Sequence, residues 1–288
     1  MTFRQIQRAA AGLLRDNEIP APDSDALFLL QYVTGMDLTR YLLNAGEEAG
    51  EEVKERCLAL ARLRAAHVPL QHIIGSAPFM GRDFIVNDKV LVPRQETEVL
   101  AEEAIRILKQ SFPEGNVLDL CTGSGILAVT LSLEVPQARI EASDISAEAL
   151  EVACENAAKL GADVIFREGD LFENTEGVFD LIVTNPPYIP TGVIPTLDSE
   201  VKDHDPLLAL DGGEDGFRVI SRIIRSAPAY LSDNGWLLAE IGYDQGERIS
   251  RELAKAKWRD IKILRDLSGH SRVAAARRPL HENIQRKE

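Results

Sequence analysis

The sequence predicts an α/β fold in which a Rossmann-like seven-stranded sheet follows a small N-terminal helical bundle, the two joined by a β-hairpin. From residue 116 onward, short apolar β-branched runs alternate with helical patterns, which is typical of a parallel sheet with crossover helices. Before residue 71, apolar residues recur at helical spacing instead. We therefore expect a bundle over 1–70, a hairpin linker over 71–92 and an α/β domain over 93–288.

Composition indicates an ordinary globular protein. Of the 288 residues, 45% are hydrophobic and 27% are charged. The three cysteines are far apart and odd in number, which fits a reducing compartment better than a disulfide framework. Arginines interrupt the apolar positions of the first 15 residues, so these lack the continuous core of a signal peptide, and no apolar run could span a bilayer. We expect a cytoplasmic protein with no membrane partner.

The charge balance disfavours a nucleic-acid substrate. Lys and Arg total 32 against 46 Asp and Glu, which gives a net charge of −14. A protein that depends on phosphate contacts usually carries a basic surplus, and here the basic clusters are only local. The five histidines show no paired spacing with cysteine or acid, so we expect no metal site.

The first 67 residues predict several helices. Apolar residues from Ile6 to Leu14 recur at helical spacing, and the proline pair at 20 and 22 ends that helix. Asp23 or Ser24 is the expected cap of the next helix, which ends at Gly35, and a third helical pattern covers 51–66.

The linker at 71–92 changes character. Phe84 and its neighbours favour a strand, and the turn residues Asn87-Asp88 are expected to lead into a second strand at Val90–Val92.

The α/β part alternates strands and helices. The expected strands are 116–120, 139–143, 163–167, 180–184, 235–241, 260–267 and 271–276. One helix is expected to open within 93–98 and to end at 108, and further helices are expected over 126–133, 147–160, 216–231 and 245–254. Ser146 is the expected N-cap of the helix over 147–160, and Gly161 is expected to end it. A long loop is expected over 199–215.

Acidic or amide residues follow four successive strands of this pattern: Asp119, Asp144, Asp170 and Asn185. In an open α/β sheet the carboxyl ends of the strands face the ligand crevice. Asp144 follows Gly125 by 19 residues, close to the spacing of a ribose-binding acid after a Gly-rich turn. That turn, Cys121-Thr122-Gly123-Ser124-Gly125, lacks the lysine and length of a P-loop, which argues against nucleotide triphosphate hydrolysis.

The sequence Asn185-Pro186-Pro187-Tyr188 predicts a rigid corner at the end of a buried strand. Two prolines prevent a ladder or a helix, so they leave carbonyls and the Asn amide beside an aromatic ring. Such a corner can hold a planar NH2 group between two acceptors and a ring face. A proline-rich turn closed by an Asn cap is the alternative from these four residues alone.

D-x-x-T-G-S-G, the acid at Asp144 and the NPPY corner together resemble the class I S-adenosylmethionine-dependent methyltransferases that act on a planar nitrogen. NPPY is shared by adenine DNA methyltransferases and by the enzymes that methylate the GGQ glutamine of bacterial peptide chain release factors. The segments QHIIGSAPFMGRDFIVNDKVLVPRQETE and DPLLALDGGEDGF are similar to the release factor glutamine methyltransferases, as is the N-terminal bundle. The chain departs from that pattern at Gln95, Cys121 and Asp205, where Pro, Gly and Glu are usual.

The resemblance implies a catalytic domain over 93–288, S-adenosylmethionine as cofactor and release factors as protein substrates in translation termination. It implies that the Asn185 oxygen and the Pro186 carbonyl accept the hydrogens of the glutamine amide, while Tyr188 packs on the amide plane and Pro187 stiffens the corner. Cofactor contacts are expected from Asn185 and, by resemblance, from Cys121, Thr122, Gly123, Ser124, Gly125, Asp144, Asp170 and Leu171. Arg94, Glu96 and Glu98 are expected either to cover the pocket or to form structural ion pairs.

Two alternatives remain from the sequence. An adenine methyltransferase would need a target-recognition domain and a basic cleft, for which this chain has no evident room. A non-catalytic cofactor-binding protein would have no need of an intact NPPY corner.

Overall fold

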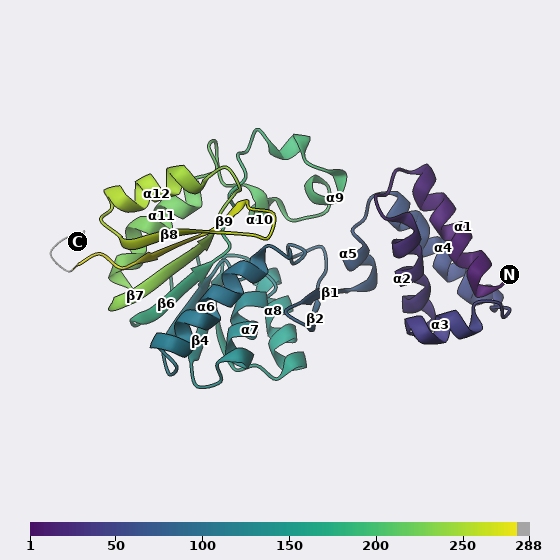
Figure 1. Ribbon diagram of the computed structural model, residues 1–288, viewed down its shortest axis with the longest axis horizontal. Coiled ribbons are helices and arrows are strands. Elements are labelled where there is room, and N and C mark those ends of the chain that lie inside the picture. Colours follow the sequence, from purple (N-terminus) through teal and green to yellow (C-terminus); the bar gives the residue numbers. More distant parts are fainter. Residues whose placement is uncertain (281–288) are drawn as a thin grey trace. The chain divides into compact units, whose positions relative to one another are not determined.

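The computed structural model describes residues 1–280, and residues 281–288, including His281 and the end of the expected third domain, lie outside the described residues (Figure 1). The chain forms two compact units, Met1–Ser76 with Asp198–His204, and Ala77–Leu197 with the chain from Asp205 onward. The division into three segments expected above stays a prediction. Among residues 1–280, no helix has the length and apolar character that crossing a membrane requires, and the cytoplasmic location also stays a prediction.

The first unit is helical. Its helices are α1 (Phe3–Asp16), α2 (Pro22–Thr34), α3 (Leu38–Asn44), α4 (Glu51–Ala65), α5 (Leu70–Ile74) and α9 (Ser199–Lys202). Thr2 and Gln5 form a capping box at the start of α1. The expected cap of α2 at Asp23 or Ser24 was wrong: Ala21 is the N-cap, and Pro22 occupies the first helical position, where it needs no N–H partner.

A β-hairpin follows, with β1 (Ser76–Phe79) and β2 (Arg82–Ile85) in a two-stranded sheet. Its turn is Met80-Gly81, where both residues have positive φ (47° and 72°), the conformation that matches the twist of a two-residue hairpin. The turn expected at Asn87-Asp88 is present, because the Asn87 carbonyl accepts the Val90 N–H at 3.3 Å and the Asn87 side chain accepts the Lys89 N–H at 2.9 Å. The strand expected at Val90–Val92 was wrong. Val90 and Val92 are buried, so their apolar pattern reflects packing rather than strand pairing.

The second unit contains a seven-stranded sheet with the order β5-β4-β3-β6-β7-β9-β8, which confirms the predicted fold class. The strands are β3 (Asn116–Leu120), β4 (Arg139–Asp144), β5 (Val164–Glu168), β6 (Phe179–Thr184), β7 (Leu231–Glu240), β8 (Arg259–Arg265) and β9 (Ser271–Arg277). Strands β3 to β7 pair in parallel, and β9 runs antiparallel to both β7 and β8. The chain reverses direction along the sheet beside β3, which neighbours both β4 and β6, so the carboxyl ends of these strands flank a switch point.

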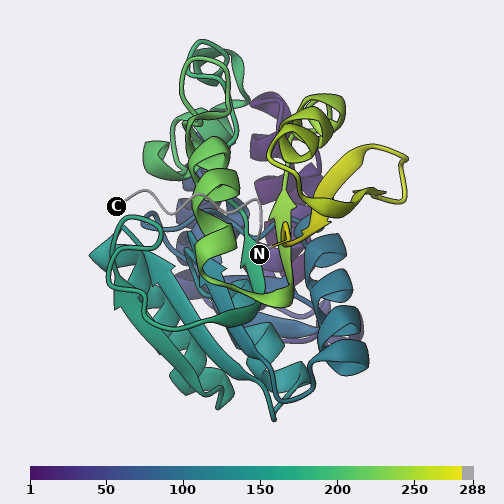
Figure 2. The ribbon, with the colours of Figure 1, turned by 90° about the vertical axis from the view of Figure 1, so that its left-hand side faces the viewer.

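Helices cover both faces of the sheet, as Figures 1 and 2 show. They are α6 (Thr97–Ser111), α7 (Ile126–Glu134), α8 (Ala147–Leu160), α11 (Arg218–Ser226) and α12 (Gly246–Lys255). Along β3, Val117 belongs to the core with α6 and α7, whereas Leu118 and Leu120 belong to the core with α11 and α12. Burial on both faces explains why the strands read as continuous apolar runs.

The segment expected to be a long loop, 199–215, holds two short helices, α9 and α10 (Leu207–Leu210), and the single helical turn η1 (Ile194–Thr196) precedes it. The helix expected over 216–231 ends earlier, because η2 (Ala227–Ala229) interrupts it at Pro228 and β7 already begins at Leu231.

Candidate active site

A cavity of about 280 Å³ lies beyond the carboxyl ends of β3, β4, β5 and β6. Nine of the site residues predicted from the sequence line it: Cys121, Thr122, Gly123, Ser124, Asp144, Asp170, Leu171, Asn185 and Pro187. Gly125, Pro186 and Tyr188 are not among its lining residues. Strand-end residues that are far apart in the sequence therefore meet around one cavity, as the topology of a parallel sheet requires.

Two further segments close the cavity. One runs from Lys89 to Thr97 and includes Arg94, and the other includes Pro206, Leu208 and Ala209. Both segments resemble a known family in sequence, but no pocket contact was predicted for the second.

The Gly-rich turn after β3 is held by the buried Asp119. Its Oδ2 accepts hydrogen bonds from the Thr122 hydroxyl at 2.6 Å and from the Ala128 backbone N–H at 3.1 Å. Gly125 has a φ of 79°, and a Cβ there would lie 3.0 Å from the Cβ of Ala153 on α8. Gly125 therefore allows the start of α7 to pack closely against α8, while the residues before it face the cavity.

Asp144, the last residue of β4, is positioned by its own backbone neighbours. Its Oδ2 accepts the Gly123 N–H at 2.8 Å, and its Oδ1 accepts the Ser146 N–H at 2.9 Å. Burial raises the pKa of this carboxyl, and these backbone hydrogen bonds oppose the shift. A carboxylate offers about four lone-pair sites, so both oxygens can still accept the hydroxyl protons of a ribose. These acceptor oxygens fit the ribose hydroxyls of the nucleoside part of S-adenosylmethionine.

Asp170 and Leu171 follow β5. The Asp170 carboxylate forms an ion pair with Arg222 of α11 at 2.8 Å, and both side chains remain more than one third exposed. Leu171 has a positive φ of 58°, and its carbonyl accepts the Ser143 hydroxyl at 3.1 Å. This bond fixes an apolar, nearly buried side chain in the cavity wall, which suits a flat aromatic ring.

The corner after β6 is clamped by the glycine-rich loop at 212–216. The Ile189 carbonyl accepts the Gly212 N–H at 2.8 Å, and the Tyr188 carbonyl accepts the Gln245 side-chain N–H at 3.0 Å. A Cβ at Gly216, whose φ is 74°, would lie 2.4 Å from the Tyr188 carbonyl oxygen. No side chain fits there, so glycine permits the loop to press on the corner.

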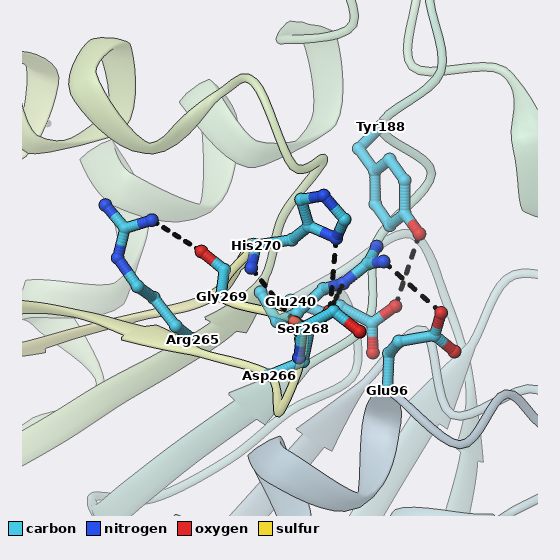
Figure 3. Close-up of polar contacts among 9 residues, drawn as sticks. Glu96, Tyr188, Glu240, Arg265, Asp266, Ser268, Gly269 and His270 are labelled. Atoms are coloured by element: carbon cyan, nitrogen blue, oxygen red, sulfur yellow. Dashed lines mark hydrogen bonds and ion pairs between the residues drawn. The ribbon is translucent and has the colours of Figure 1, made fainter.

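Within the corner, Asn185 and Pro187 line the cavity. The Asn185 Nδ2 donates to the Thr97 hydroxyl of α6 at 3.5 Å. Burial and the neighbouring Glu240 carboxyl raise the pKa of Tyr188, so the hydroxyl keeps its proton and donates to Glu240 Oε1 at 3.3 Å (Figure 3).

Glu240 was not among the predicted site residues. It ends β7, is 2% exposed, and lies directly beyond the last β6–β7 pair, Thr184 and Ala239. The signal that would have found it is the one used for the other strands: a polar residue where a buried parallel strand ends.

The three residues expected either to cover the pocket or to form structural ion pairs all have partners within the protein. Arg94 lines the cavity and pairs with the buried carboxylate of Asp205 at 2.7 Å. Glu96 pairs with Arg272 at 3.2 Å, and Glu98 accepts the Met80 backbone N–H at 2.8 Å. Among residues 1–280 there is no group of three His, Cys, Asp or Glu side chains that could hold a metal ion.

Comparisons with known proteins agree with this geometry. The family model "Methyltransferase small domain" matches residues 97–194, and the "PrmC N-terminal domain" model matches residues 5–75. The chain is 41% identical over 278 residues to the release factor glutamine methyltransferase of Deinococcus radiodurans, covering 96% of this chain and 99% of that protein. It is 36% identical to that of Geobacter sulfurreducens, covering 96% of each. A crystal structure of a methyltransferase from Pyrococcus furiosus has the same fold (TM-score 0.51, 17% identity, 70% of this chain, 91% of that chain).

The seven-stranded sheet and the cavity at its switch point define a class I S-adenosylmethionine-dependent methyltransferase. The extent and level of identity then decide the family. The chain belongs to the release factor glutamine methyltransferases.

Proposed function

We propose that the protein transfers the methyl group of S-adenosylmethionine to the side-chain amide nitrogen of the GGQ glutamine of peptide chain release factors. One observation carries this proposal: a single cavity is lined both by the Gly-rich turn with Asp144 and by Asn185 with Pro187. A cofactor held by the first set therefore has its neighbour in the second. The substrate class follows from the family to which the chain belongs.

For the cofactor, we assign the ribose hydroxyls to Asp144 and the methionine end to the backbone of 121–125. The adenine ring would lie against Leu171, with its amino group near Asp170. Both side chains line the cavity together with Asp144. S-adenosylmethionine supplies an activated sulfonium methyl, so the protein's contribution is positioning and local electrostatics.

For the substrate, the obstacle is the amide itself, whose nitrogen lone pair is delocalised into the carbonyl. The Asn185 side-chain oxygen and the Pro186 carbonyl would accept the two amide hydrogens, which orients the nitrogen and stabilises the positive charge that it gains. Pro187 holds the corner rigid. The Tyr188 ring would pack on the amide plane, and its hydroxyl, which donates to Glu240, would hold the ring in place.

The test is transfer of label from S-adenosylmethionine carrying a labelled methyl group. Purified protein is mixed with a release factor, with the same factor whose GGQ glutamine is replaced by alanine, or with DNA. We expect label on the intact factor alone. The net charge of −14 leads us to expect none on DNA. Label on DNA alone would make this an adenine methyltransferase, and label on neither would favour a cofactor-binding protein without transfer.

A further inference from the structure

Glu240 has no role in the function proposed above, although it is buried directly behind the corner. Figure 3 shows its side chain beside those of Tyr188 and Glu96. It is 2% exposed, and its Oε2 has no hydrogen-bond partner among the described residues, while Oε1 accepts the Tyr188 hydroxyl. A buried carboxyl with one unpaired oxygen is unfavourable for folding, and the neighbouring Thr97 hydroxyl is a donor that can turn toward it.

Thr97 connects Glu240 to Asn185. Its side chain lies at the start of α6 and is 1% exposed. The Thr97 hydroxyl accepts the Asn185 N–H, and the same hydroxyl lowers the pKa of the Glu240 carboxyl. A hydroxyl has one proton to donate. When that proton faces an ionised Glu240, the lone pairs face Asn185 and accept its NH2 group.

The Asn185 amide is planar, with NH2 and oxygen on opposite sides of its carbon. An NH2 group that donates to Thr97 therefore leaves the oxygen on the other side of the amide, where the cavity that Asn185 lines can receive it. Only that orientation offers an acceptor to a substrate amide, because the reversed side chain would present donors to donors.

We propose that Glu240 is a positioning residue for methyl transfer: through Thr97 it sets the orientation of the Asn185 amide, and through Tyr188 it holds the corner in place. This inference rests on the proposed role of Asn185 as an acceptor. Glu240 itself touches neither substrate nor cofactor.

The charges around Glu240 make the arrangement sensitive to pH. Burial raises the pKa of Glu240 to about 7, Thr97, Tyr188 and Arg272 lower it, and Glu96 raises it. Below that pH the carboxyl is protonated and can donate to Thr97. The Thr97 proton then turns toward Asn185 and competes with its NH2 group. The rate of methyl transfer should therefore decline on the acidic side with an apparent pKa near 7. The substrate amide itself has no group that titrates in this range.

The first experiment compares Glu240→Gln with the unaltered protein and with Asp180→Asn. Asp180 is a matched control because it is an acid near the opposite end of β6 that accepts hydrogen bonds from Ser232 and the Asn116 backbone. We expect Glu240→Gln to lower kcat by about 10- to 100-fold, as misplacement of a positioning group does, with cofactor affinity within about threefold. The acidic limb near pH 7 should disappear, and Asp180→Asn should keep both.

Variants of Thr97 keep the test valid if Glu240→Gln folds poorly. Thr97→Val removes the hydroxyl at constant shape and should lower kcat to a similar degree, and Thr97→Ser should restore most of it. If Glu240→Gln lowers cofactor affinity as much as kcat, or changes neither kcat nor the pH profile, the proposal is wrong.

A second readout does not depend on the substrate. The side-chain NH2 signal of Asn185 in a 1H–15N NMR spectrum, assigned by its loss in Asn185→Ala, should shift with an apparent pKa near 7 in the unaltered protein and not in Glu240→Gln. A signal that does not titrate overturns the proposal, whether or not release factors accept label. Titration without transfer to a release factor would instead refute the proposed substrate.

Discussion

Asp144 is fixed by the turn that it helps to form, because its Oδ2 accepts the backbone N–H of Gly123 at 2.8 Å. A single carboxylate thus links the end of β4 to the Gly-rich turn after β3, in a residue that also lines the cavity.

We expect Asp144→Asn to weaken cofactor binding by about 10- to 100-fold, the loss expected for hydrogen bonds to a charged acceptor. Asp170→Asn should weaken it less, because Asp170 is already paired with Arg222 and partly exposed. Calorimetric titration with S-adenosylhomocysteine measures both. Because burial raises the pKa of Asp144, affinity should fall as acid protonates this carboxyl. An equal or larger loss in Asp170→Asn would contradict the assignment.

Asn185→Ala separates the substrate side of the cavity from the cofactor side. We expect the rate of methyl transfer to a release factor to fall by about 100-fold or more, because the acceptor for the substrate amide is lost. Cofactor affinity should change far less. Single-turnover transfer at saturating cofactor, together with equilibrium binding, measures the two effects. Comparable losses in both would mean that Asn185 mainly holds the cofactor.

The strand ends of the sheet could be predicted from the sequence because their signal is local. Asp144 and Asn185 each follow a buried apolar run, and the parallel topology brings such ends to one edge. The helix caps at Ser146 and Gly161 were predicted for the same reason, and the structure has both.

Other features depend on contacts between distant segments, which no local pattern contains. The position of Glu240 beside the corner depends on the pairing of β6 with β7. The part of the cavity wall formed by Leu208 comes from the segment 199–215, for which the sequence predicted only a loop. The linker was misassigned at Val90 because burial alone produces an apolar pattern that resembles a strand.

Gly216→Ala should disturb the corner from outside the cavity. The new Cβ would meet the Tyr188 carbonyl oxygen at 2.4 Å, at a φ of 74° that disfavours a side chain. We expect a loss of stability of about 1–3 kcal/mol and a fall in kcat of about tenfold or more. Gly192→Ala is the matched control, because nothing lies within 4 Å of a Cβ there. Urea unfolding and transfer rates measure both, and equal behaviour of the two variants would contradict the clamp.

Asp119 should make stability depend on pH. Burial raises its pKa from 3.8 to about 7, although the Thr122 hydroxyl and the Ala128 N–H oppose the shift. Between about pH 4 and 7 the folded state therefore binds more protons than the unfolded state, and stability falls as pH rises through this window. Asp119→Asn removes this contribution, which is on the order of a few kcal/mol at most, and should flatten the dependence. Urea unfolding from pH 4 to 8 measures it. The pKa of Glu240 also lies at about 7, so its part of the change of stability with pH should remain in Asp119→Asn. A dependence of stability on pH that is unchanged in this variant would rule out the contribution of Asp119.

Arg64 is the buried cation of the helical unit. It is 4% exposed, pairs with Asp25 of α2 at 2.7 Å, and also reaches Glu200 of α9. Removing it leaves the Asp25 carboxylate buried without a partner, so Arg64→Ala should destabilise this unit by about 3–5 kcal/mol. The control is Arg15→Ala, which breaks an exposed pair with Asp23 and should change stability by about 0–1 kcal/mol.

Hydrogen exchange of the α1, α2 and α4 amides in the full chain reports the stability of this unit separately from the sheet. If the two variants lower protection equally, the Arg64 pair contributes no more than a surface ion pair. Recovery of protection in Arg64→Ala combined with Asp25→Ala would identify the unpaired carboxylate as the cause.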